Sequence, residues 1–133
     1  MNGKSVLEMR SSSIILADRP LPQVGSLDFS IHVSTTVNLS AEDARRKVNR
    51  FVHRELSYLM RGELPSLVIA DHVCWRVPIV LTFPSHGPVG IVGNIDVDVA
   101  TGELRVSSGL IAEIEHRAQD LAARTAPHTT PAG

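Results

Sequence analysis

The 133-residue sequence has a single cysteine, few aromatic residues and no long hydrophobic run. Because Cys74 has no second cysteine to pair with, a disulfide within the chain is excluded and a reducing compartment is expected. Aromatic residues form 4% of the chain, so the core must be mostly aliphatic and a base-stacking platform is not expected. The apolar run Ile14–Leu16 is too short for a signal peptide or a membrane span. We therefore expect a cytoplasmic protein with no membrane partner.

The chain also lacks an excess of charge of either sign. Its 13 Lys and Arg residues nearly balance 14 Asp and Glu residues, which argues against a general binder of polyanions. The two halves nevertheless differ in charge. Residues 40–61 carry six basic and three acidic side chains, a net +3, and residues 71–120 carry three basic and seven acidic ones, a net −4. This division suits head-to-tail self-association as well as an external partner.

The composition, 43% hydrophobic and 20% charged, is typical of one small globular domain. Residues 1–26 show no sustained periodicity and are interpreted as a loosely ordered N-terminal arm or an edge segment. Residues 27–124 form the predicted domain, and residues 125–133 form a predicted disordered tail.

Apolar periodicity predicts a strand followed by a helix in the first half of the domain. Alternating apolar residues predict a strand over residues 27–33, which residues 35–37 extend. Ser40 is the predicted N-cap of the helix, and Gly62 and Pro65 are expected to end it. The apolar stripe of this helix recurs at three- and four-residue steps and consists of Ala41, Ala44, Val48, Phe51, Val52, Leu56, Leu59 and Met60.

The second half of the domain predicts an antiparallel hairpin. Odd-numbered positions are apolar in residues 73–83 and again in residues 89–99, with one interruption at Gly93. Residues 84–88, with two prolines and a glycine, are expected to turn the chain. The implied register places Phe83 opposite Val89, Arg76 opposite Asp96, and Cys74 opposite Asp98.

Prolines and glycines mark expected irregularities in these strands. Pro78 cannot donate to a strand ladder, which predicts a free edge or a bulge beside it. Gly90 and Gly93 indicate a bulge or the close approach of another segment, and Gly102 is expected to absorb the parity change before the next strand. Ser108 is the predicted cap of a last helix with the apolar residues Leu110, Ile111, Ile114, Ala118 and Leu121. The predicted fold is therefore α+β, with an antiparallel sheet of about four strands, one long helix packed on one face and a C-terminal helix.

Residues 40–106 resemble a PepSY-type domain. The resemblance lies in the helix start Ser-Ala-Glu-Asp-Ala at residues 40–44, in Trp-Arg-Val-Pro at 75–78, and in the Asn-Ile-Asp-Val-Asp-Val-Ala-Thr-Gly-Glu-Leu segment at 94–104. It implies a PepSY/cystatin-like fold and a small non-enzymatic domain, of a kind often found in peptidase propeptides and proposed to restrain peptidases. No functional residue is transferred from that family.

Two short motifs contain residue types that can support chemistry. His72 and Cys74 share one face of a strand, where a histidine can promote a thiolate, but a turn residue beside a half-buried small residue is the favoured interpretation. Asp96 and Asp98 can bind a divalent cation, but cross-strand pairing with Arg76 and turn formation account for them better. We expect no catalytic residue, no metal site and no cofactor.

Three functional hypotheses remain open. The first is a non-enzymatic binding or regulatory module that contacts a protein partner or a second copy of itself, through a sheet edge or the basic face of the first helix. The second is a nucleic-acid-associated factor whose phosphate contacts come from Arg46, Arg50 and Arg54, at four-residue steps on that helix. The third is a small-ligand-binding or minor enzymatic domain with a pocket near Trp75.

Overall fold

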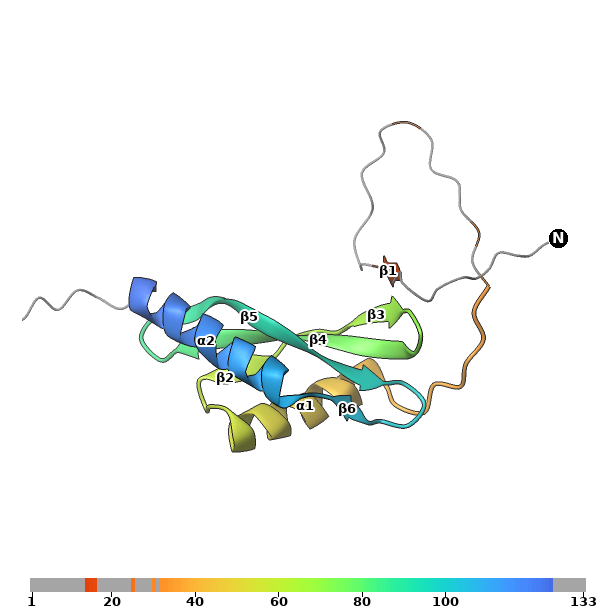
Figure 1. The fold of residues 1–133 in the computed structure, drawn as a ribbon, viewed down its shortest axis with the longest axis horizontal. Helices are drawn as coiled ribbons and strands as arrows, with labels where there is room; N and C mark the ends of the chain where they lie inside the picture. Colours follow the sequence, from red (N-terminus) through yellow and green to blue (C-terminus); the bar gives the residue numbers. More distant parts are fainter. Residues whose placement is uncertain (1–13, 17–24, 26–29, 31, 126–133) are drawn as a thin grey trace, which may run out of the picture.

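The protein is described here by a computed structural model that covers residues 14–16, 25, 30 and 32–125 (Figure 1). This part of the chain contains two helices and six strands. They are β1 (Ile14–Leu16), α1 (Ala41–Glu55), β2 (Met60–Gly62), β3 (Ser66–Ile69), β4 (Val73–Phe83), β5 (Gly87–Asp98), β6 (Leu104–Arg105) and α2 (Ser108–Thr125). Neither helix of the described residues has the length and apolarity needed to cross a membrane.

The strands form one antiparallel sheet, which confirms the α+β prediction. The strand order is β1-β3-β4-β5-β6, and β2 also pairs with β4. The 11 residues of β4 are enough for its outer edge to pair first with β3 and then with β2, which raises the strand number above the expected four or so. Ile14–Leu16, expected in an arm or an edge segment, is an edge strand against β3.

The β4–β5 hairpin has the expected register at one end only. Arg76 lies opposite Asp96 and Cys74 opposite Asp98, as predicted. At the other end Phe83 lies opposite Gly87, so the predicted pairing with Val89 is wrong. Two register shifts, between residues 79 and 80 and between residues 81 and 82, each insert one extra residue into β5.

Pro78 occupies a gap in the outer edge of β4, as its missing N–H predicts. The partner β3 ends opposite Arg76 and the partner β2 starts opposite Ile79, so no strand needs a donor from Pro78. The Pro78 carbonyl is still used, because it accepts from the Glu63 amide at 2.9 Å. The proline is therefore accommodated where the sheet changes neighbours.

Helix α1 begins where expected but ends earlier. The Ser40 side chain accepts from the Asp43 amide at 3.0 Å, which confirms the N-cap. The helix stops at Glu55, so the expected end near Gly62 is wrong, and Met60 lies in β2 instead. The open edge of β4 explains the difference, because Leu59 accepts from the Thr82 amide at 2.7 Å and Met60 pairs with Leu81. The main-chain groups of Leu59 and Met60 thus bond to β4 instead of extending α1.

The strand expected over residues 27–37 is not present in the described part of that segment. Ser30 and residues 32–37 belong to no strand, and Val33 and Val37 are exposed. Residues 26–29 and 31 lie outside the described residues. Before α1, the Asn38 amide donates to the Val99 carbonyl at 2.8 Å, just beyond the end of β5. Alternation of apolar and polar residues was therefore not sufficient to place residues 32–37 in a strand.

Helix α2 lies along β5, where two glycines admit its side chains. A Cβ added at Gly93 would lie 2.7 Å from Cγ1 of Ile114, and one at Gly90 would lie 2.9 Å from a Cδ of Leu121. This confirms the predicted close approach. The cap is Ser107, whose Oγ accepts from the Leu110 amide at 3.1 Å, rather than the predicted Ser108. Thr125, expected in the tail, ends α2, and residues 126–133 lie outside the described residues.

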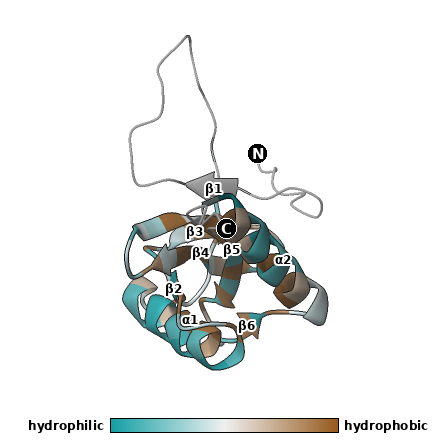
Figure 2. Ribbon diagram, turned by 90° about the vertical axis from the view of Figure 1, so that its left-hand side faces the viewer, coloured by the Kyte–Doolittle hydropathy of each residue, from teal (hydrophilic) through white to brown (hydrophobic). Residues whose placement is uncertain are grey.

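A single core unites the two helices with the sheet. In Figure 2 the hydrophobic segments of β4 and β5 lie between α1 and α2. Helix α1 contributes Val48 and Val52, and α2 contributes Ile114, all of them fully buried. The sheet contributes the buried residues Met60, Val77, Ile79, Leu81, Val92, Ile95 and Val97 to the same cluster. Aliphatic side chains predominate in this core, as the scarcity of aromatic residues predicted.

Candidate functional site

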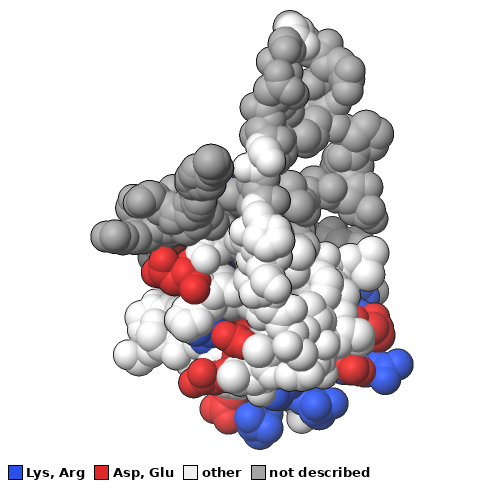
Figure 3. All heavy atoms as spheres, turned by 90° about the vertical axis from the view of Figure 1, so that its right-hand side faces the viewer, with Lys and Arg blue, Asp and Glu red and all other residues white. Residues whose placement is uncertain are grey.

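The arginines predicted to contact phosphate lie on the exposed side of α1. Arg46 and Arg54 are about two-thirds exposed, and Arg50 is exposed as well. Acidic neighbours reduce the charge of the stripe, because Arg46 Nε lies 3.3 Å from Glu42 and Arg54 Nε lies 3.0 Å from Glu55. Among the described residues, Arg50 alone of the three forms no ion pair. On the face shown in Figure 3, acidic and basic side chains likewise gather together rather than in a patch of one sign.

Trp75 links the sheet to the segment that precedes α1. Its side chain packs against the core cluster, and its indole N–H donates to the Leu39 carbonyl at 2.7 Å. The tryptophan therefore fixes the entry of the chain into α1. The ligand pocket expected beside it stays a prediction.

The His72 and Cys74 side chains line one hollow, but the thiol is poorly suited to nucleophilic chemistry. Cys74 is 5% exposed, whereas His72 is largely exposed. Burial raises the pKa of the Cys74 thiol, and the nearby Asp96 carboxylate raises it further. Because the thiolate is the reactive form, this environment favours the interpretation of Cys74 as a buried small side chain.

Asp96 and Asp98 have separate structural partners. Asp96 receives both arms of the Arg76 guanidinium, at 2.8 and 2.9 Å, which is the pairing expected from the sequence. The Oδ1 atom of Asp98 accepts from the amides of Ala100 and Thr101, at 2.8 and 2.9 Å. Two carboxylates engaged in this way form a cross-strand pair and a turn rather than a cation site.

The turn carboxylate predicts a specific acid sensitivity. The two main-chain amides, first that of Thr101 and then that of Ala100, lower the pKa of Asp98 from its ordinary 3.8. A depressed folded-state pKa adds stability above the unfolded value, and this stability is lost as the pH falls through the folded pKa. We expect the melting temperature of the wild type to exceed that of Asp98→Asn by a constant margin near neutral pH. That margin should shrink below about pH 3.8. A margin independent of pH down to pH 2 would contradict this role.

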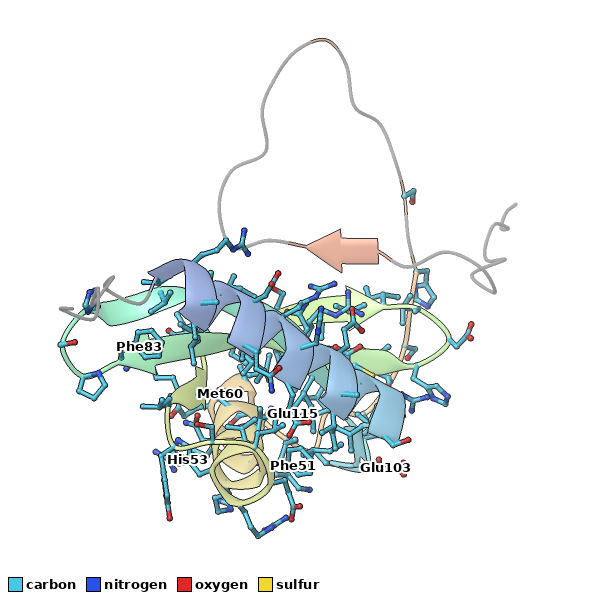
Figure 4. All side chains as sticks on the ribbon, turned by 60° about the vertical axis from the view of Figure 1, so that its left-hand side comes forward. Phe51, His53, Met60, Phe83, Glu103 and Glu115 are labelled. Atoms are coloured by element: carbon cyan, nitrogen blue, oxygen red, sulfur yellow. The ribbon has the colours of Figure 1, made fainter. Side chains whose placement is uncertain are left out.

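A mostly apolar hollow lies where α1 gives way to β2. It has a volume of about 380 Å³. We call it the Tyr58 surface, and its lining residues are Asn49, His53, Tyr58, Leu59, Met60, Arg61, Thr82 and Pro84. Tyr58 is 87% exposed and Leu59 is 38% exposed, and the Tyr58 ring centre lies 6.2 Å from that of His53. Figure 4 shows His53 on the flank of α1 toward the end of the sheet that carries Phe83, away from Phe51.

One polar atom of the Tyr58 surface has no partner. The Thr82 hydroxyl oxygen is buried and forms no hydrogen bond within the described part of the chain. Buried polar atoms usually have a partner, so this hydroxyl is an exception among the described residues. Sequence reasoning missed this surface, because Leu59 and Met60 were assigned to a helix stripe and Tyr58 carried no motif. The one sequence feature that could have indicated this surface is Tyr58, an aromatic residue just after the end of α1.

A second, polar groove follows the opposite edge of the hairpin. Arg76, Asp96 and Arg105 lie side by side on β4, β5 and β6, since Asp96 is opposite both arginines in the registers. Two hollows share these three residues. One continues toward Glu113 and Arg117 of α2, and the other toward His72 and Cys74. The sequence predicted the Arg76–Asp96 pair but not the addition of Arg105, because that residue depends on how the β5–β6 turn sets the register.

In comparisons with known proteins, no protein-family model, curated protein or solved structure matches this chain.

Proposed function

We propose that this protein is a non-enzymatic binding module of the cytoplasm that contacts a protein partner or a second copy of itself through the Tyr58 surface. The exposure of Tyr58 beside an apolar hollow is the observation that carries the proposal. A PepSY-like relationship remains part of this proposal, because it too implies a small domain that acts by contact.

The composition of the Tyr58 surface favours protein contact. Tyrosine and arginine are enriched at protein interfaces, and here Tyr58, Arg61 and Leu59 surround one hollow. Burial of an exposed aromatic or leucine side chain is worth about 1.5–3 kcal/mol, so two such residues supply a useful part of a binding energy.

The other candidate groups support a non-enzymatic role. The Cys74 thiol is buried and its pKa is raised, while Asp96 and Asp98 are held by Arg76 and by turn amides. A general base or a nucleophile needs a free and suitably titrating side chain near a substrate position. These residues are instead committed to the fold.

The direct test replaces both exposed apolar residues with serine, as Tyr58→Ser with Leu59→Ser. Tyr58 is 87% and Leu59 38% exposed, and neither residue belongs to the core cluster, so the fold should tolerate the change. We expect sedimentation velocity or a titration with a captured partner to show association weakened about 30-fold or more, the loss typical of an interface hot spot.

The matched control is Leu64→Ser, because Leu64 is 73% exposed and does not line the hollow. This control should retain wild-type association. Equal association of the wild type and the double variant would refute the use of this surface. A strictly monomeric protein with no captured partner would refute the binding module itself.

A second candidate function, nucleic-acid binding, is supported by the exposure of Arg46, Arg50 and Arg54 on one side of α1. Contact with phosphates would make the affinity fall steeply with salt concentration. The acidic neighbours weigh against it, because Glu55 pairs with Arg54 and Glu42 is shared between Arg45 and Arg46. This function therefore stands second.

A further inference from the structure

The polar groove beside β6 has the form of a small binding site. We call it the arginine groove and define it by Arg76, Asn94, Asp96, Arg105 and Arg117. The larger of its two hollows measures about 350 Å³, and the smaller, on the His72 side, measures about 230 Å³. Ligand pockets begin at about 300 Å³, so the larger hollow suits a small molecule.

Positive charge remains unpaired in the arginine groove. Both oxygens of Asp96 are taken by Arg76, and Glu113 lies 2.8 Å from Arg117. Arg105 is exposed, and among the described residues it forms no ion pair. In the larger hollow, three arginines therefore face two carboxylates, and the remaining positive charge lies on Arg105. The smaller hollow adds the carboxylate of Asp71. A cation would meet repulsion here, whereas an anion would meet an available guanidinium.

The position of Arg105 makes it reachable from several directions. Its side chain lines both hollows of the arginine groove and also the shallow groove along residues 103–107. The strand ladder holds its backbone, because Arg105 is paired with Asp96. The backbone of Arg105 is thus fixed by strand pairing, while its guanidinium is exposed and able to turn toward a ligand.

The remaining walls of the larger hollow complement an anion with an apolar body. The exposed Asn94 contributes an amide that can donate hydrogen bonds. Leu110 is partly buried and is the apolar side chain that this hollow exposes, above the fully buried Val92 and Ile114.

We propose that the arginine groove binds a small organic anion whose carboxylate or phosphate head contacts Arg105. Arg117 and the Asn94 amide provide the neighbouring donors, and Leu110 contacts the apolar body. Arg76 and Asp96 hold one another and keep the floor of the groove in place. This proposal is independent of the Tyr58 surface, and either can fail without the other.

Thermal shift and calorimetric titration with four probes test the proposal. Phenyl phosphate and benzoate carry the two head groups on the same ring, benzyl alcohol is the neutral comparison, and inorganic phosphate lacks the apolar body. At constant ionic strength we expect at least one aromatic anion to raise the melting temperature, more than inorganic phosphate does, and benzyl alcohol to have no effect. The tighter of the two aromatic anions identifies the head group.

Two variants assign the binding to the arginine groove. Arg105→Gln removes the free charge and Asn94→Asp adds a repelling one, and both positions are exposed, so the fold should be retained. Each should weaken binding at least about tenfold, the loss expected for one charge-assisted hydrogen bond. Arg124→Gln is the control, because Arg124 lies on α2 outside the groove, and it should bind as the wild type does. No shift with any anion at millimolar concentration, or an unchanged shift in both variants, would overturn the proposal.

Discussion

Ile79→Ala should lower the free energy of unfolding by about 2–5 kcal/mol, the range for large-to-small changes at buried isoleucines. Ile79 is 0% exposed and belongs to the cluster that α1, α2 and the hairpin share. The loss combines the transfer energy of the removed carbons with the cavity they leave. Chemical denaturation followed by circular dichroism measures it directly.

The same hairpin provides a matched control for that prediction. Ile91 is 63% exposed on β5, so Ile91→Ala should change the free energy of unfolding by no more than about 0.5 kcal/mol. Comparable losses in the two variants would contradict the assignment of the core. A transition in Ile79→Ala that splits into separate steps would contradict a single core shared by both helices.

Gly93→Ala should destabilise the protein by about 1–3 kcal/mol, although alanine normally suits a strand better than glycine. Replacement of a strand glycine gains roughly 0.5–1 kcal/mol from backbone entropy. At this position the new Cβ would lie 2.7 Å from Cγ1 of Ile114, whose side chain is fully buried. Because the clash is with Cγ1 of a fully buried side chain, relief requires α2 or Ile114 to shift, and we expect the steric cost to exceed the entropic gain. Thermal denaturation of the variant gives the sign directly.

A glycine of the helix supplies the contrast for Gly93. The nearest atom to a Cβ at Gly109 is the Ser107 hydroxyl oxygen, at an ordinary 3.8 Å. Gly109→Ala should therefore be neutral or stabilising by up to about 1 kcal/mol, because alanine favours the helix. A stabilising Gly93→Ala would show that α2 does not rest on β5 as described.

Local patterns predicted the features that follow from residue type and its place in a regular alternation. The Ser40 cap follows from its hydroxyl, the Arg76–Asp96 pair from the alternation of the two strands, and the close approach at Gly90 and Gly93 from their missing side chains. Gly102 belongs with them, since its φ of +77° is the left-handed conformation that glycine adopts most easily. These are also the features that hold the hairpin and α2 in place.

Features that depend on distant partners could not be predicted in the same way. The end of α1 was misplaced because the competing hydrogen bonds come from β4, about 20 residues later. The far end of the hairpin was shifted by bulges that alternation does not reveal. For the same reason neither the Tyr58 surface nor the place of Arg105 in the arginine groove followed from sequence, since each combines residues from separate elements.

The central claim, that this protein acts by contact through the Tyr58 surface, is tested most directly by a nuclease-treated pull-down with two variants compared side by side. One variant combines Tyr58→Ser with Leu59→Ser, and the other replaces Arg46, Arg50 and Arg54 with glutamate. The partner, or a differently tagged second copy, should be recovered with the arginine variant and lost with the serine variant. Recovery with the serine variant and loss with the arginine variant would contradict the claim and favour the basic face of α1.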